Sequence, residues 1–118
     1  MGHVDPDCLF CKIVAGDIPA TIVDRTDRVV AFRDIDPKAP THVLVIPVEH
    51  QPNAGATAAA DPALIGELVA TAARIAGSEG ADADGYRMVF NTGAGAGQSV
   101  FHTHLHLLGG RPFSWPPG

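Results

Sequence analysis

The hydrophobic and polar positions of the chain fall into short segments with two different periods. Five runs rich in β-forming residues predict strands, at residues 21–25, 28–33, 41–48, 86–91 and 99–108. Two other segments, residues 7–16 and 61–77, place apolar side chains three and four positions apart, which is typical of helices. The order helix, three strands, helix, two strands predicts an α+β domain with two helices and a five-stranded, mostly antiparallel sheet.

The longer predicted helix has a well-marked start. Asp61 can serve as its N-cap, and Pro62 suits the first helical position. A glycine, Gly77 or Gly80, is expected to end this helix. The preceding segment, residues 51–60, is rich in alanine and is expected to be irregular.

The first predicted helix is short and lies close to the N-terminus. Asp5 or Asp7 can cap its start, and Gly16 can end it. Residues 1–6 are expected to be flexible, and residues 111–118 contain too much proline for regular structure. The sequence shows no repeat or domain boundary, so its 118 residues are expected to form a single domain.

Composition narrows the possible partners of this domain. Apolar residues make up 46% of the chain and charged residues 18%, which favours a folded core over a disordered chain. The net charge is -5 without any run of Lys or Arg, which argues against nucleic acid or an anionic membrane as the main partner. No apolar stretch approaches the roughly 20 residues of a membrane span, and the N-terminus lacks signal-peptide features, so we expect a cytoplasmic location.

The strongest chemical signal is a row of alternating histidines, His102, His104 and His106. In a strand, alternate side chains project from the same face, so the three imidazoles would share one face. The residues between and after them, Thr103, Leu105 and Leu107, would then face the core. Because imidazole can act as base, acid, nucleophile or metal ligand near neutral pH, the row indicates a phosphate site or a metal site.

The segment before the histidines is a glycine-rich loop, residues 91–99. It matches neither a Walker A loop nor the dinucleotide-binding pattern, and alone it is typical of a flexible connection. Beside the histidines it can also bind phosphate, because glycine allows main-chain N–H groups to approach anionic oxygens. Gln98 and Ser99 add side-chain donors to this loop.

Two cysteines, Cys8 and Cys11, are spaced as in a Cys-x-x-Cys motif. This spacing suits two packing thiols, a redox pair or half of a zinc site. His50 and His102 are candidates for the other half, because two thiolates and two imidazoles satisfy tetrahedral zinc.

The segment His-Thr-His-Leu-His-Leu-Leu at residues 102–108 resembles the signature of the histidine triad (HIT) family. Thr103 departs from the strictly hydrophobic position of that signature, although a β-branched residue suits a strand. Residues 31–42, 97–100 and 108–111 and the Trp-Pro-Pro-Gly end resemble the HINT branch, and the similarity runs from about Cys8 to the C-terminus.

The resemblance implies a HIT-like fold and a homodimeric enzyme that hydrolyses purine nucleoside 5′-phosphoramidates through a nucleotidyl-histidine intermediate. It implies that His104 is the nucleophile and that His106 contacts the phosphoryl oxygens. His42 would orient and polarise His104 through the hydrogen-bonded cluster of histidines. The phosphate would be bound by Asn91, Gly97, Gln98 and Ser99, with Ser99 near the leaving group. Asp34 would bind the ribose, and the base pocket would consist of Leu9, Phe10, Ile13, Phe32 and Ile35.

The cysteines depart from the metal-free HINT proteins but resemble several bacterial HIT proteins and the related galactose-1-phosphate uridylyltransferases. Those proteins hold a structural zinc ion through Cys-x-x-Cys and two histidines, a pattern matched by Cys8, Cys11, His50 and His102. His102 would then connect a structural metal to the reactive His104, rather than act only in catalysis.

Two other functions remain open from the sequence. One is hydrolysis of dinucleoside polyphosphates, as in the Fhit branch of the family, against which the Trp-Pro-Pro-Gly end argues. The other is a non-enzymatic protein that binds nucleotide or zinc, against which the intact histidine set argues.

Overall fold

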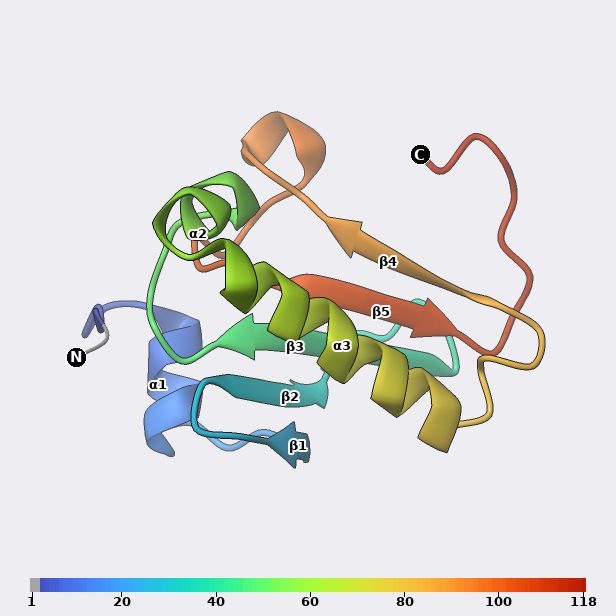
Figure 1. The fold of residues 1–118 in the computed structure, drawn as a ribbon, viewed down its shortest axis with the longest axis horizontal. Coiled ribbons are helices and arrows are strands. Elements are labelled where there is room, and N and C mark those ends of the chain that lie inside the picture. The colour runs from blue at the N-terminus through green and yellow to red at the C-terminus, as the bar shows by residue number, and fades with distance from the viewer. Residues whose placement is uncertain (1–2) are drawn as a thin grey trace.

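The computed structural model describes residues 3–118 and contains one antiparallel sheet of five strands (Figure 1). Its elements are α1 (Leu9–Ala15), β1 (Ile22–Arg25), β2 (Val29–Arg33), β3 (Thr41–Pro47), α2 (Ala54–Ala60), α3 (Pro62–Ser78), β4 (Tyr86–Phe90), the 3-10 turn η1 (Ala94–Ala96) and β5 (Leu105–Gly109). The strand order β1-β2-β3-β5-β4 places β3 and β5 inside the sheet and β1 and β4 at its edges. The predicted α+β class and antiparallel sheet are confirmed.

Different elements bury the two faces of the sheet. Helix α3 lies across one face (Figure 1), and every second residue of the strands packs against its apolar side. This core comprises Val29, Ala31, Val43, Val45, Leu64, Leu68, Ala72, Ile75, Ala76, Ala81, Leu105 and Leu107. Helix α1 packs on the opposite face, where Phe10 and Ile13 lie with Phe32 and Leu44.

The pairing of β3 with β5 gathers the polar candidates on the α1 face. Leu44 lies opposite His106, and His42 lies opposite Leu108. Opposite residues of neighbouring strands point to the same face, so His42 and His106 lie on the face that carries Leu44. Leu105 and Leu107 face the other way and are fully buried, as the sequence predicted.

The alanine-rich segment contains a third helix, so the prediction of an irregular segment and of only two helices is wrong. Helix α2 starts after Asn53, whose side-chain Oδ1 accepts a hydrogen bond of 2.9 Å from the N–H of Ala56. Alanine has the highest helix propensity, and the asparagine supplies the N-cap. Thr57 anchors this helix, because its buried hydroxyl lies 2.7 Å from that of Thr103.

The first helix begins later than predicted. Its N-cap is Cys8, whose sulfur accepts a hydrogen bond of 3.4 Å from the N–H of Cys11, so the predicted aspartate caps are wrong. Gly16 ends the helix as expected, with a φ of 83° that suits glycine. The cysteine cap holds both sulfur atoms at the first turn of α1.

Helix α3 starts at Pro62, as predicted, and ends at Ser78, between the two glycines expected to end it. Asp61 precedes it as expected, but its carboxylate makes no capping hydrogen bond. That carboxylate pairs instead with Arg28, which joins the start of α3 to β2.

The last strand is shorter than predicted. It begins at Leu105, so the predicted strand at residues 99–104 is wrong. The N–H of Thr103 donates to the carbonyl of Gln51 at 2.8 Å instead of to a neighbouring strand. This bond draws the segment away from the sheet ladder and toward the loop before α2.

The loop after β2 is held against the end of β5. A Cβ atom added at Gly110 would lie 2.9 Å from the Pro40 side chain, so only glycine allows this close approach. The Nε–H of Arg111 donates to the Lys38 carbonyl at 2.8 Å. Strand β5 thus positions the loop that begins with Asp34 and leads into β3.

The two ends of the chain differ in their contacts. Residues 1 and 2, part of the predicted flexible start, lie outside the described residues, whereas the His3 carbonyl accepts a hydrogen bond of 2.6 Å from the N–H of His50. The predicted irregular tail contains neither helix nor strand, and its Trp115 is 83% exposed. Within residues 3–118, no helix has the length and hydrophobicity needed to cross a membrane.

Candidate active site and metal centre

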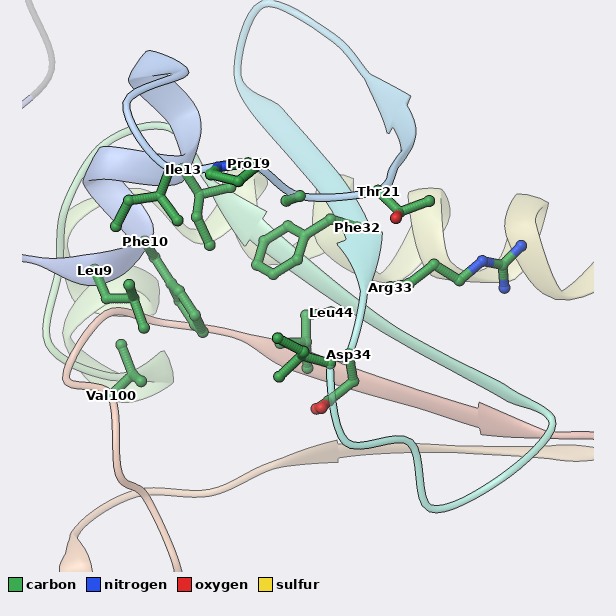
Figure 2. A pocket seen from close by; sticks show the side chains of 13 residues that line it. Leu9, Phe10, Ile13, Pro19, Thr21, Phe32, Arg33, Asp34, Leu44 and Val100 are labelled. Carbon is green, nitrogen blue, oxygen red and sulfur yellow. The ribbon is translucent and has the colours of Figure 1, made fainter.

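A pocket of about 580 Å³ lies between α1 and strands β2 and β3 (Figure 2). Phe10 and Phe32 point into it, and their rings meet edge to face with centroids 5.4 Å apart. All five predicted base-pocket residues line it, together with Asp34; the lining is Leu9, Phe10, Ile13, Ile18, Pro19, Ala20, Thr21, Phe32, Arg33, Asp34, Ile35, Leu44 and Val100. The pocket therefore offers an apolar slot with a carboxylate beside it.

The histidine row lies next to this pocket, on the side of the sheet covered by α1. The Phe10 ring centroid is 5.1 Å from that of His104 and 6.0 Å from that of His102. The ring centroids of His104 and His106 are 5.0 Å apart. The structure thus keeps the three imidazoles together, although only His106 belongs to β5.

His104 has its proton fixed on one ring nitrogen. Its Nδ1 lies 2.7 Å from the His102 carbonyl oxygen, which can only accept, so Nδ1 carries the hydrogen. Nε2 then holds a free electron pair. Burial lowers the pKa of His104 below its ordinary value of 6.5, which keeps the ring neutral at pH 7. A neutral imidazole with its pair on Nε2 is suited to nucleophilic attack.

His42 and His106 form a hydrogen-bonded pair. The Nε2 of His42 lies 2.9 Å from the Nδ1 of His106, and the N–H of Lys38 donates to the Nδ1 of His42 at 3.0 Å. Burial lowers the pKa of His106 to about 4 and also lowers that of His42. Both rings are therefore neutral at pH 7. The hydrogen bond of His42 goes to His106, so any effect of His42 on His104 would pass through His106.

Asp34 lies beside this pair and at the apolar pocket. One of its carboxylate oxygens is 3.4 Å from the Nε2 of His42, and the other accepts from the N–H of Asp36 at 2.8 Å. Asp34, His42 and His106 lie close enough together to suggest a metal site. The Lys38 N–H argues against it, because a neutral His42 whose Nδ1 accepts a hydrogen bond carries its proton on Nε2 and has no pair there for a metal.

A second cluster joins α1 to the segment before β5. It consists of Cys8, Cys11, His50 and His102, whose ligand atoms all lie within 4.8 Å of one another. The Nδ1 of His102 is 3.3 Å from the Cys8 sulfur, 3.6 Å from the Cys11 sulfur and 3.2 Å from the Nδ1 of His50. Both thiols are free and buried. These four residues could hold a metal ion.

His102 belongs to both clusters. Its Nε2 lies 2.7 Å from the carbonyl oxygen of Pro47, so the hydrogen is on Nε2 and the electron pair of Nδ1 points at the two sulfurs. Its main-chain carbonyl is the acceptor that holds His104. The ring thus faces the candidate metal centre while the peptide group of the same residue faces the candidate nucleophile.

The glycine loop is braced by Gln98. Its buried side-chain amide accepts from the N–H of Gly93 at 2.8 Å and donates to the carbonyls of Pro52 and Val100 at 2.7 and 3.1 Å. The N–H groups of Gly97 and Gln98 are bonded within the loop. The structure therefore gives Gln98 the geometry of a loop brace rather than of a side chain extended toward a ligand.

The remaining predicted phosphate residues lie around this loop. Asn91 is half-buried directly after β4, and Gly97 ends η1 with a φ of 90°. Ser99 is exposed and lines a second hollow of about 390 Å³, which also borders Cys8 and His50. Because Leu9 and Val100 line both hollows, Ser99 lies next to the apolar pocket but outside it.

Sequence reasoning missed the groups that orient the histidines. These are main-chain atoms, the carbonyls of Pro47 and His102 and the N–H of Lys38, and such groups leave no mark in a side-chain pattern. Val100 was missed as a pocket residue, although it stands just before the histidine row. Thr57 gave no signal, because its role depends on a helix that was not predicted.

Comparison with known proteins decides the family. A HIT domain model matches residues 15–113. The chain belongs to the HIT family. It is 46% identical over 106 residues to the purine nucleoside phosphoramidase of Escherichia coli K12, covering 90% of this chain and 89% of that protein. It is 50% identical over 112 residues to an uncharacterised HIT-like protein of Synechocystis, covering 95% of this chain and 97% of that one.

Solved structures of HIT proteins share the fold. A HIT family hydrolase from Legionella pneumophila superposes with a TM-score of 0.91 at 49% identity, covering 95% of this chain and all of the other. A HIT family hydrolase from Clostridium thermocellum superposes with a TM-score of 0.91 at 40% identity, covering 94% of this chain and 96% of the other. The predicted family, the HIT-like fold and the hydrolase class are therefore confirmed.

Proposed function

We propose that this HIT protein hydrolyses purine nucleoside 5′-phosphoramidates through a covalent nucleotidyl intermediate on His104. The observation that carries this proposal is the hydrogen bond from His104 Nδ1 to the His102 carbonyl, which leaves the electron pair on Nε2 beside an apolar pocket. The similarity to the E. coli purine nucleoside phosphoramidase supports the choice of substrate.

The reaction follows from the protonation states of the histidines. The Nε2 of His104 attacks the phosphorus atom, the phosphorus–nitrogen bond breaks, and the amine leaves with the electron pair of that bond and takes up a proton. Water then breaks the bond between His104 and phosphorus and releases the nucleoside monophosphate. His106, with Nδ1 accepting from His42, carries its hydrogen on Nε2 and can donate it to a phosphoryl oxygen as negative charge builds up there.

The pocket suits the other parts of such a substrate. An apolar slot with two aromatic rings can hold a purine face, and Leu9, Phe10, Ile13, Phe32 and Ile35 remain the proposed base contacts. The Asp34 carboxylate can accept hydrogen bonds from ribose hydroxyls. Asn91, Gly97, Gln98 and Ser99 remain the proposed phosphate group of residues, with Gln98 acting through the loop that it braces.

We further propose that Cys8, Cys11, His50 and His102 bind a structural zinc ion. A tetrahedron with zinc–sulfur bonds of about 2.3 Å and zinc–nitrogen bonds of about 2.0 Å has edges of roughly 3.3–3.8 Å. Four of the six distances between the donor atoms are 3.2–3.6 Å and fit these edges, and all six lie within 4.8 Å. When bound, the ion would tie α1 to the segment before β5 and would supply no step of the reaction.

The protein's assembly and location remain proposals based on the family resemblance. A homodimer is consistent with β4, which lies at an edge of the sheet. Light scattering of the purified protein would measure its mass directly. Purine nucleotides are the proposed partners, in a cytoplasmic protein without nucleic acid or membrane contacts.

The central experiment compares wild type with His104→Ala on an adenosine 5′-phosphoramidate. Loss of the nucleophile should lower kcat/KM by at least about 1000-fold. Mass spectrometry of acid-quenched wild type should show a nucleotidyl adduct on His104, which the variant lacks. Equal activity of the two proteins would refute the mechanism. A higher kcat/KM for dinucleoside polyphosphates would assign the other substrate class, and nucleotide binding without turnover would indicate a binding protein.

A further inference from the structure

The loop between β2 and β3 contributes a main-chain group to the histidine relay. We propose that the peptide N–H of Lys38, braced by Arg111, fixes the tautomers of His42 and His106 and so positions a hydrogen-bond donor at the phosphoryl site. Lys38 is here a positioning residue that acts through its backbone. The inference rests on the proposed function, since it assigns the origin of the His106 donor.

The first step is the contact between Lys38 and His42. The Lys38 nitrogen lies 3.0 Å from the Nδ1 of His42. A main-chain N–H can only donate, so this Nδ1 must carry an electron pair and the hydrogen of the neutral ring must sit on Nε2. His42 is only 5% exposed, and burial lowers its pKa, so the neutral form prevails at pH 7.

In the second step, the tautomer of His42 determines the tautomer of His106 through a hydrogen bond. The Nε2 of His42 lies 2.9 Å from the Nδ1 of His106 and therefore donates to it. The neutral His106 ring then has its hydrogen on Nε2. In the opposite tautomer, His106 would present an electron pair to an anionic phosphoryl oxygen, which is repulsive. The Lys38 N–H on one side of the His42 ring, and the Asp34 carboxylate oxygen 3.4 Å from its Nε2 on the other, thus favour the tautomer in which His106 donates.

The third step is the brace that holds Lys38. Arg111 donates from Nε to the Lys38 carbonyl at 2.8 Å and from a terminal nitrogen to the Pro112 carbonyl at 3.0 Å. Its guanidinium lies over the Phe113 ring, 4.3 Å from the centroid. Because Arg111 lies two residues after the end of β5, the strand that carries His106 also leads to the side chain that holds the Lys38 loop.

The side chain of Lys38 makes no hydrogen bond to the relay, and its charge acts on His42 only through space. It is exposed and pairs with Asp36 at 2.7 Å, on the solvent side of the loop. The residue can therefore be changed in two ways that separate backbone from side chain. Lys38→Pro removes the N–H, whereas Lys38→Ala keeps it and removes the ammonium group.

The direct test is the ring-nitrogen NMR spectrum of the resting enzyme, which distinguishes the tautomers without substrate. We expect His42 and His106 to carry hydrogen on Nε2 in wild type and in Lys38→Ala. In Lys38→Pro, the Nδ1–H form of one or both rings should appear. Against Lys38→Ala, kcat of Lys38→Pro should fall by about 10–100-fold, the equivalent of losing one hydrogen bond to a charged group. KM should stay within about threefold, because the apolar pocket is unchanged.

A second pair of variants covers the case in which Lys38→Pro fails to fold. Arg111→Ala removes the brace and keeps the N–H, and it should shift the tautomers and kcat in the same direction by a smaller factor. Arg87→Ala is the matched control, since Arg87 donates to the Ser114 carbonyl at 2.9 Å and lies over the same Phe113 ring without reaching Lys38. Wild type with hydrogen on Nδ1 of His106, or Lys38→Pro and Arg111→Ala with unchanged tautomers, would overturn the inference. The spectra need no turnover, so this result is independent of whether phosphoramidates prove to be substrates.

Discussion

The two histidine clusters of this protein use the same side chain for different chemistry. In the metal cluster, the candidate metal site formed by Cys8, Cys11, His50 and His102, the four ligand atoms lie within 4.8 Å of one another. In the relay, hydrogen-bond donors and acceptors alternate from the Lys38 N–H through His42 to His106. The first arrangement leaves room for a cation, whereas the second is complete without one.

Main-chain partners create this difference. A carbonyl, that of Pro47, takes the Nε2–H of His102 and leaves its Nδ1 free to bind a metal. A peptide N–H, that of Lys38, occupies the Nδ1 of His42 and leaves its Nε2 as a donor. The comparison shows that the chemistry of a buried histidine depends on which of its two ring nitrogens forms a hydrogen bond with the main chain.

The largest effect is expected from the relay. His106→Asn shortens the side chain and removes the donor to the phosphoryl oxygen, so kcat should fall by about 100–1000-fold, as for other donors that stabilise a developing oxyanion. The metal content measured by elemental analysis should not change, because His106 lies outside the metal cluster. A variant that lost its metal along with its activity would show that the two clusters are one site.

The next effect concerns stability and is expected from the metal cluster. Cys11→Ala should lose the metal and lower the free energy of unfolding by about 2–4 kcal/mol, because the ion would tie α1 to the segment before β5 only in the folded state. Urea unfolding with and without a chelator measures this. The chelator should destabilise wild type and leave Cys11→Ala unaffected. Equal sensitivity of both proteins would exclude this cluster as the metal site.

A smaller effect is expected at the junction of the clusters, where Thr103 lies between His102 and His104. Its hydroxyl lies 2.7 Å from that of Thr57, and both side chains are buried. Thr57→Val keeps the shape but removes this hydrogen bond and should cost about 1–2 kcal/mol of unfolding free energy. Ser78→Ala, a change at the end of α3 away from both clusters, is the control for a general effect of losing a hydroxyl.

The features that were predictable from the sequence depend on the pattern of side chains, and those that were not depend on main-chain contacts. The strands, the long helix and the apolar face of residues 103–107 follow from periodicity, because burial depends on which face a side chain occupies. Helix α2 could not be predicted from periodicity, because residues 54–60 contain no large apolar side chain, and only its cap, Asn53, marks its start. The start of β5 was misplaced because the Thr103–Gln51 bond is a long-range backbone contact.

At the candidate active site, too, side-chain types were predictable from the sequence and main-chain contacts were not. Residue types and the family resemblance placed Asp34, His42 and the histidine row in one region, and the structure brings Asp34, His42 and His106 together. The partner of His42 was not predictable, because the strand register, which pairs His42 with Leu108, places His106 diagonally across from it. The tautomers were not predictable either, since they depend on carbonyl and N–H groups that every residue possesses.

The smallest effect is a pH dependence of stability that belongs to the relay. Burial lowers the pKa of His106 from 6.5 to about 4, so between these values the unfolded chain binds a proton that the folded protein excludes. The free energy of unfolding should therefore decrease as the pH falls below about 6.5, by less than about 1 kcal/mol for this group between pH 7 and pH 6. Urea unfolding of wild type and His106→Asn at pH 7 and pH 6 measures the contribution of His106 to this pH dependence. Both proteins are kept in excess chelator, so the residues of the metal cluster titrate alike in both. Their effect then cancels when the two pH-dependent changes in unfolding free energy are subtracted. Wild type should lose more stability than the variant over this step. A wild type that loses less would mean that His106 is protonated in the folded protein, and the relay could not then have the polarity that the Lys38 N–H imposes.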